Sequence, residues 1–328
     1  MSKFSHVLFA GLLSMAVMAP VADAQGKTLR MSMLAPAVNI ESQLVEKVFI
    51  PYVEEKSGGK YKIEYYPGAT LGNTETVVQG VVMGTIDLAL DTAGNLDQFC
   101  PSLALLDLPY LFEREDVSKL NNSPVGEKLR RTGERTGLYI IDLNCWFPRN
   151  LISRTPMKNM ADMQGAKNRT TGSKWQMMGI SAMGMKPVPT PAAEMLTAIQ
   201  QGMVDSMDIN LPAMLGYRVI DVAKHVTITN QAQMMGAYVC SSEFWEELSD
   251  EDRKIFTDAA KAWSKALDEA VATRSEDLIA QLKQAGGQVV ILDDAETAKL
   301  KAQTEANLAK ALTAKENALL EEIRAAVK

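Results

Sequence analysis

The feature that most limits the possible folds is a long stretch without proline or glycine, which runs from Ser249 to Ala285 and stops at Gly286-Gly287. It opens with Ser249-Asp250-Glu251-Asp252, which is typical of a helix N-cap followed by acidic residues in the first turn. At about 1.5 Å per residue, the predicted helix is roughly 50 Å long, enough to contact two domains. The pattern equally allows an amphipathic helix that packs on one domain only.

Strand and helix patterns alternate along the rest of the chain, which is the signature of α/β domains with helices packed on a sheet. Once a leader is removed, roughly 300 residues remain, enough for two such domains. We therefore expect two α/β domains. The expected strands are 28–34, 61–66, 86–90, 138–143, 151–154, 166–170, 204–209 and 226–229, and the expected helices are 44–52, 74–83, 173–180, 192–201 and 295–327.

The first 24 residues are predicted to be a secretory signal peptide. Lys3 gives a positive start, an apolar run follows from Val7 to Ala19, and Ala22-Asp23-Ala24 has the small-x-small pattern of a cleavage site. That run is shorter than the ~20 residues of a membrane span, and no later stretch of the sequence reaches this length. A retained membrane anchor is the alternative. We expect cleavage near Ala24, a periplasmic mature chain and no membrane-spanning segment.

Composition and cysteine usage exclude some classes of partner. The formal net charge of -6 argues against nucleic acid, whose phosphates require a basic surface. The three cysteines, Cys100, Cys145 and Cys240, are too widely spaced for a CxxC metal or redox motif. One disulfide with one thiol left over and three buried free thiols are both open.

The sequence contains no recognisable catalytic or cofactor motif. His225 is the only histidine beyond the leader, and there is no HExxH, no GxSxG, no phosphate-binding GxxxxGK[ST] and no GxGxxG after a strand. A single histidine cannot build the usual zinc site. We therefore expect no enzyme activity, no metal and no cofactor.

Two arginines are the strongest candidates for ligand binding. Arg149 lies at the edge of a strand, and Arg169 lies inside a strand-like segment between Gly165 and Gly172. A guanidinium is always charged and holds a carboxylate through two parallel hydrogen bonds. The alternative is that each arginine forms an ion pair with a carboxylate of the protein itself.

Together with other segments, these arginines resemble the solute-binding component of TRAP transporters (tripartite ATP-independent periplasmic transporters). Each match is weak alone, but six occur in order over nearly all of the mature chain. They are Tyr66–Asn73 (YPGATLGN), Gly84–Leu88 (GTIDL), Asp107–Phe112 (DLPYLF), Arg149-Asn150 with Arg169, Gln200–Asp205 (QQGMVD) and Phe244–Ser249 (FWEELS).

The resemblance implies a two-domain periplasmic-binding-protein fold with a ligand cleft between the domains and the long helix spanning both. It places residues 25–146 and 235–275 in the first domain, and residues 147–234 and 276–328 in the second. Arg169 would be the main carboxylate clamp, and Arg149 a second contact at the mouth of the same site. The partners would be a small organic acid and the membrane subunits of a TRAP transporter.

The sequence departs from the family pattern beside the predicted clamp. Ile209 stands where many members carry a ligand-contacting Asn, and Asn210 comes one residue later, so that in a strand it would face the other way. Ala192 stands where relatives often have a large aromatic residue, and Ser206 replaces the usual glycine. These differences predict that the arginine clamp is the same as in the family, whereas the other residues of the ligand pocket differ. We therefore expect a carboxylate ligand but name no compound.

Four further residues complete the candidate ligand site. They are Asn210 itself, Trp146 and Trp175, whose rings could stack on a ligand, and Thr92. Core packing is the alternative for both tryptophans. The rival function is a periplasmic enzyme acting on a carboxylated molecule, and a receptor that serves a sensor protein is a third interpretation. Neither the oligomeric state nor a metal beside the ligand is predicted by the sequence.

Overall fold

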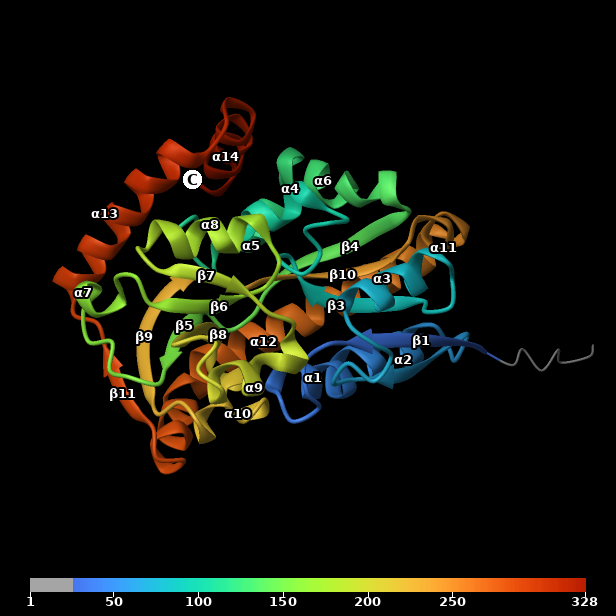
Figure 1. Ribbon diagram of the computed structural model, residues 1–328. Coiled ribbons are helices and arrows are strands. Elements are labelled where there is room, and N and C mark those ends of the chain that lie inside the picture. The colour runs from blue at the N-terminus through green and yellow to red at the C-terminus, as the bar shows by residue number, and fades with distance from the viewer. Residues whose placement is uncertain (1–25) are drawn as a thin grey trace, which may run out of the picture.

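The computed structural model describes residues 26–328, which form two lobes, each built on one β-sheet covered by helices (Figure 1). The predicted signal peptide lies outside the described residues. Among residues 26–328, no helix is long and apolar enough to cross a membrane. The alternation of strand and helix patterns therefore produced the α/β class that was expected from it.

The sheet of the first lobe has five strands in the order β2-β1-β3-β10-β4. β1 is parallel to β2 and β3, whereas β10 is antiparallel to β3 and β4 because the chain returns here from the other lobe. The strands are β1 Lys27–Met33, β2 Tyr61–Tyr66, β3 Leu88–Thr92, β4 Leu138–Cys145 and β10 Met235–Ser241; the helices are α1 Ile40–Leu44, η1 Val45–Phe49, α2 Ile50–Lys56, α3 Thr74–Val82, α4 Pro101–Ala104, η2 Leu105–Asp107, α5 Asp116–Asn121, α6 Pro124–Arg130, η3 Arg131–Thr136 and α11 Ser242–Glu247.

The sheet of the second lobe has six strands in the order β11-β9-β5-β8-β6-β7. β6 and β8 run parallel, so their carboxyl ends, which carry Arg169 and Asn210, lie at the same edge of the sheet. The strands are β5 Arg149–Ser153, β6 Lys167–Thr170, β7 Lys186–Pro189, β8 Ser206–Asn210, β9 His225–Ala232 and β11 Gln288–Ile291; the helices are α7 Met160–Met163, α8 Lys174–Ala182, η4 Ala192–Glu194, α9 Met195–Gln200, α10 Leu211–Gly216 and η5 Val219–Asp221.

Two short crossings connect the lobes. The chain leaves the first sheet after β4 and enters the second at β5, and it returns between β9 and β10. The Trp146 amide donates to the Met234 carbonyl at 2.8 Å, so the two crossings are hydrogen-bonded to each other. This arrangement puts the residues just before and after the crossings at the boundary between the lobes.

The long helix α12, Asp250–Gln284, lies under both lobes (Figure 1). Ser249 caps it by accepting from the Asp252 amide, as the sequence predicts. It contacts α1, α2 and β4 in the first lobe, and α10 and β11 in the second. Trp263 and Phe256 on it are fully buried, as is Leu282 near its far end. The question that the sequence left open is answered: the helix spans both lobes, and the predicted fold class is confirmed.

The C-terminal region differs from its prediction. It was expected as one helical segment that belongs to the second domain with the rest of 276–328. Instead α13, Asp294–Ala311, packs on α7 and α8, whereas α14, Ala314–Val327, packs on α5 and α6 of the first lobe. Thr313 starts the second helix with a capping box closed by Glu316, and this cap redirects the chain back across the boundary.

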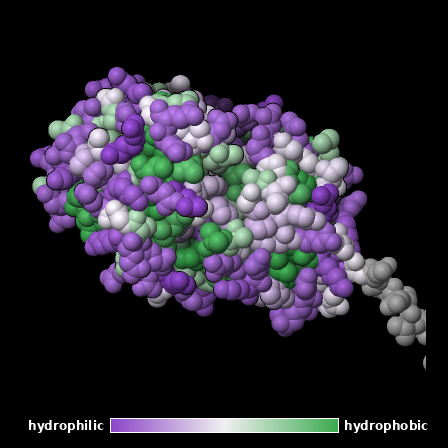
Figure 2. Space-filling view, turned by 60° about the horizontal axis from the view of Figure 1, so that its bottom comes forward, coloured by the Kyte–Doolittle hydropathy of each residue, from purple (hydrophilic) through white to green (hydrophobic). Residues whose placement is uncertain are grey.

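The surface and the cysteines are unexceptional. Figure 2 shows a mostly hydrophilic face on which hydrophobic side chains lie in separate groups. Cys100, Cys145 and Cys240 are all buried and free, which answers the second open question in favour of three unpaired thiols. Burial raises the pKa of the Cys145 thiol to about 12, so it stays protonated at neutral pH.

Candidate functional site

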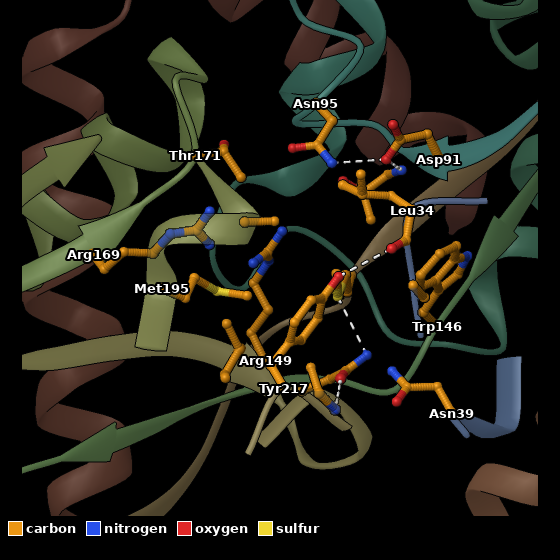
Figure 3. Close-up of a pocket in the computed structure, with 17 residues that line it drawn as sticks. Leu34, Asn39, Asp91, Asn95, Trp146, Arg149, Arg169, Thr171, Met195 and Tyr217 are labelled. Carbon is orange, nitrogen blue, oxygen red and sulfur yellow. Dashed lines mark hydrogen bonds between the residues drawn. The ribbon is translucent and has the colours of Figure 1, made fainter. Parts of the chain in front are cut away.

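A cavity of about 60 Å³ lies between the lobes, lined by residues from both (Figure 3). The first lobe contributes the segment after β1 and the end of β3, and the second contributes the ends of β6 and β8 with α10. Trp146 and Met234 come from the two crossings. The lining residues are Leu34, Ala35, Asn39, Asp91, Thr92, Asn95, Trp146, Arg149, Arg169, Thr171, Ala192, Met195, Ile209, Asn210, Ala213, Tyr217 and Met234.

The cavity continues into an outer groove of about 710 Å³. The two spaces share part of their walls, which include Arg169, Thr171 and Tyr217 of the second lobe and Asn95 of the first. The outer groove has more polar walls, with Glu75, Asp97 and Gln98 among its lining residues. A small molecule therefore has a path from solvent past Arg169 to the inner cavity.

Arg169 is a buried cation for which the protein provides no counter-charge in direct contact. Its side chain is buried, and its Nε and Nη2 donate to the Thr190 carbonyl at 2.9 and 2.5 Å. Within residues 26–328 it forms no ion pair, and its Nη1 forms no hydrogen bond. Burial lowers the pKa of the Arg169 guanidinium to about 10, with Arg149 adding to the effect and Asp208 opposing it. At neutral pH it stays charged, which favours an anion in the cavity.

Arg149 has the opposite environment although it lines the same cavity. Its Nη2 lies 3.3 Å from Asp107 Oδ2, and its Nη1 lies 3.9 Å from Asp208 Oδ2 and donates to the Asp208 carbonyl at 3.3 Å. Asp107 belongs to the first lobe and Asp208 to β8, so this ion pair crosses the boundary. Arg149 was predicted to lie at the mouth of the site. The structure places it at the buried boundary, with both neighbouring carboxylates supplied by the chain.

The two carboxyl groups beside Arg149 are perturbed by their burial. Burial raises the pKa of Asp208 to about 6, an effect that Arg149 reduces most. The pKa of Asp107 is also raised by burial and lowered by Arg149. Asp208 Oδ1 accepts from Gln176 Nε2 at 2.7 Å as well. The charge of Arg149 therefore favours the ionised form of both carboxyl groups.

Asn210 lines the cavity, but its amide already has partners. It is the N-cap of α10, so its Oδ1 accepts from the Ala213 amide at 2.8 Å. Its Nδ2 donates to Glu41 Oε1 at 2.9 Å, across the boundary between the lobes. Ile209 also lines the cavity, because β8 ends at Asn210 and the strand alternation that would separate the two side chains ends with it.

Glu41 is a buried acid at this contact. It is fully buried on α1, and its Oε2 forms no hydrogen bond with the described residues. Burial raises the pKa of the Glu41 carboxyl to about 7, against the opposing hydrogen bonds and the positive charge of Arg114. The contact with Asn210 is therefore sensitive to pH near neutrality.

The remaining candidates separate into two groups. Trp146 and Thr92 line the cavity, and the Trp146 ring stays in place because its Nε1 donates to Asn144 Oδ1 at 2.7 Å. Trp175 lines neither the cavity nor the groove. It belongs to α8, and its side chain packs into the hydrophobic core of the first lobe. There its Nε1 donates to the Pro101 carbonyl at 3.1 Å. Core packing, the alternative given for Trp175, is what the structure has.

Sequence reasoning missed several lining residues. The Oδ1 atom of Asn39 is buried and forms no hydrogen bond. It packs against Gly216, where a Cβ atom would come within 2.0 Å of it. Asn95 Nδ2 donates a hydrogen bond to Asp91 Oδ1 at 2.7 Å, and the Tyr217 hydroxyl donates to the Leu34 carbonyl at 3.2 Å. None of these residues belongs to a recognisable motif. Only the ends of the predicted strands pointed to this region.

Residues 31–315 match the family described as bacterial extracellular solute-binding protein, family 7. The chain belongs to this family. The predicted resemblance to the solute-binding components of TRAP transporters is thereby confirmed. The family consists of solute-binding receptors, and some of its named members are periplasmic proteins.

Relatives in the family carry names that state their ligands. The chain is 28% identical over 251 residues to the 2,3-diketo-L-gulonate-binding periplasmic protein YiaO of Escherichia coli, covering 75% of this chain and 76% of that one. It is 26% identical over 269 residues to the sialic acid-binding periplasmic protein SiaP of Vibrio cholerae, covering 81% and 83%.

Solved structures of family members have the same architecture. A TRAP periplasmic solute-binding protein from Polaromonas sp. bound to D-erythronate superimposes with a TM-score of 0.81 at 28% identity, over 91% of this chain and 98% of that one. One from Desulfovibrio salexigens with bound orotic acid gives 0.83 at 25% identity, over 92% and 99%. The two-lobed fold is thus shared with these two acid-bound members of the family.

Within this family member, the described residues contain no cluster of His, Cys, Asp and Glu that could hold a metal ion. His225 lies at the start of β9, where its carbonyl accepts from Ser153, and it lines neither the cavity nor the groove. The site itself offers two guanidinium groups, the Asp91 carboxylate, amides, hydroxyls and apolar walls.

Proposed function

We propose that this receptor binds a small organic acid between its lobes, with Arg169 as the clamp for the carboxylate, and delivers the acid to the membrane subunits of a TRAP transporter. One observation carries the proposal: the Arg169 guanidinium lines the cavity, is buried, and is paired only with the Thr190 carbonyl. A buried cation without a counter-charge is unfavourable, and a ligand carboxylate removes that cost.

Closure of the lobes supports the same role. Asn210 bonds to Glu41 and Tyr217 bonds to the Leu34 carbonyl, so the walls of the cavity are held together by contacts between the lobes. A ligand that contacts both lobes favours this closed arrangement over an open one by its differential affinity. Exclusion of water from the closed cavity also strengthens the pair between carboxylate and guanidinium.

A receptor fits the cavity better than an enzyme does. Among the described residues, the cavity lining contains no Ser, Cys, His or Lys, and its hydroxyls come from Thr92, Thr171 and Tyr217. Thr171 Oγ1 donates a hydrogen bond to Gln176 Oε1 at 2.5 Å. This acceptor is an amide oxygen, which cannot act as a base. We propose that the bound acid is released unchanged. We also propose a periplasmic location with cleavage near Ala24, supported by the leader pattern and by the family.

The test is a thermal-shift screen of the mature protein, refolded to remove any co-purified ligand, against a panel of small carboxylates. An acid at 100 times its Kd should add about 2.7 kcal/mol of stability, which is a few degrees of Tm for a chain of this size. The shift should disappear in Arg169→Met and persist in Arg135→Met, which removes an exposed arginine. A shift that persists in Arg169→Met would show that the acid is held elsewhere.

A further inference from the structure

The C-terminal helices α13 and α14 join the two lobes once more, far along the chain from the two crossings. α13 packs on α7 and α8 of the second lobe, whereas α14 packs on α5 and α6 of the first lobe. Figure 1 shows this pair at the upper left of the molecule, with α12 below it. The boundary between the lobes is therefore crossed by α12 and again by the C-terminal pair.

Each end of the pair is anchored in its own lobe. On the second lobe, Asn307 Nδ2 of α13 donates to the Ala182 carbonyl at 2.9 Å, and Leu300 is fully buried in the hydrophobic cluster of that lobe. On the first lobe, Leu320 and Ile323 of α14 are buried in the hydrophobic core. Neither helix can leave its lobe without exposing apolar surface to water, which is unfavourable.

The joint between the two helices is short. α13 ends at Ala311 and α14 begins at Ala314, so Leu312 and Thr313 alone connect them. A cavity of about 460 Å³ lies beside this joint, lined by both helices and by residues 108–111 of the first lobe. The pair is thus held at both ends and has free space beside its middle.

The first turn of α14 is also tied to the second lobe. Glu316 Oε2 accepts from the Thr313 amide at 2.8 Å as part of the capping box, and Glu316 Oε1 forms an ion pair with Lys174 of α8. Further along α14, Glu322 pairs with Lys128 of α6 at 2.8 Å. The Glu316 pair crosses the boundary between the lobes, whereas the Glu322 pair lies within the first lobe.

We propose that α13 and α14 form a strap that limits how far the two lobes can open. For wider opening, one helix has to leave its lobe or the short joint has to lengthen, and a chain of two residues reaches no more than about 7 Å. A restricted open state has less conformational freedom to lose on closing, so the strap favours the closed cavity. This benefit for ligand binding rests on the proposed function, whereas the restriction itself does not.

The test lengthens the joint and keeps both helices. A flexible Gly-Ser insertion of about six residues between Leu312 and Thr313 adds up to roughly 20 Å of reach. Pulsed electron paramagnetic resonance then measures the distance between the lobes in the refolded, ligand-free mature chain. The nitroxide labels are attached at Met83→Cys in the first lobe and Met203→Cys in the second, at positions 71% and 53% exposed. The three native cysteines are buried and stay unlabelled.

We expect the insertion to extend the distance distribution by more than about 2 Å toward longer distances. The same insertion after Gly58, in the turn between α2 and β2 of the first lobe, should leave the distribution unchanged. Lys174→Met should give a smaller shift in the same direction, because it removes the tie across the boundary. Lys128→Met is its matched control and should give none, since the two lysine side chains are 54% and 57% exposed.

An unchanged distribution in the variant with the longer joint would overturn the strap, and so would an equal change from the insertion after Gly58. If the longer joint prevents folding, the lysine variants decide, and equal distributions in Lys174→Met and Lys128→Met overturn the strap. No acid is present in these measurements. If the distances lengthen while no carboxylate binds in the thermal-shift screen, the proposed function is wrong and the strap stands.

Discussion

Arg149 and Arg169 lie on β5 and β6, which flank β8 in the same sheet, and both are buried beside one cavity. Arg149 has two carboxylates of the chain beside it, whereas Arg169 has one carbonyl. In our proposal, this difference assigns Arg149 a structural role and leaves Arg169 for the ligand. Burial and charge alone do not make a binding residue; the decisive property is whether the protein already supplies the partner.

The largest effect on stability should come from Arg149→Met. Removal of one partner from a buried ion pair leaves uncompensated charge and typically costs about 3–5 kcal/mol. The loss should show in urea unfolding at pH 7.5, and it should shrink as the pH falls through about 6, where Asp208 takes up a proton and the uncompensated charge is removed. A change below about 1 kcal/mol would contradict the structural assignment of Arg149.

Arg169→Met should show the reverse behaviour. The affinity for the acid should fall by about 30-fold or more, in line with about 2–5 kcal/mol for the loss of one partner of a buried charge pair. The free energy of unfolding without ligand should stay within about 1 kcal/mol of wild type or rise, because a buried cation without a counter-charge has been removed. Calorimetry and urea unfolding measure the two quantities on one sample.

Glu41, which is hydrogen-bonded to Asn210, is a buried acid that can be compared with the two buried arginines. Because the pKa of Glu41 is raised to about 7 from 4.5, its contribution to stability is complete below pH 4.5 and is lost as the pH rises through 7. The loss is on the order of 3 kcal/mol. Glu41→Gln keeps an oxygen acceptor for Asn210 without a titrating proton, so unfolding measured from pH 5 to 8 should fall less steeply. An equal slope in wild type and variant would contradict this.

The smallest expected effect is a change in the fluorescence of one of two tryptophans, Trp146 and Trp175, when the ligand binds. Ligand binding should change the fluorescence of Trp146, which lines the cavity, but not that of Trp175, which is bonded to Pro101 in the core. The change should therefore disappear in Trp146→Phe and persist in Trp175→Phe. Dependence of the signal on Trp175 would place the ligand against α8 instead.

Local patterns predicted much of the fold. The N-cap at Ser249 and the long run without proline or glycine predicted α12, and alternating runs predicted most strands. β10 was missed because MGAYVCS is buried along its whole length and so does not alternate. β7 was missed because two prolines interrupt it, which is tolerated at the edge of a sheet.

The site was harder to predict because its contacts join distant parts of the chain. Residue type alone did not separate Arg149 from Arg169, and nothing near Arg149 revealed that Asp107, 42 residues earlier, is its partner. Likewise the alternation rule separated Ile209 from Asn210, although the start of α10 lets both line the cavity. Residue type and local pattern predicted the candidates, and tertiary contacts decided which groups remain free.

The most direct test of the central claim is a crystal structure of the refolded protein with the acid identified by the thermal-shift screen. We predict that the carboxylate lies between the lobes and accepts two hydrogen bonds from the Arg169 guanidinium at about 2.7–2.9 Å. Arg149 should keep its contacts with Asp107 and Asp208. A carboxylate bound to Arg149 in place of Asp107, or held in the outer groove away from Arg169, would contradict the account.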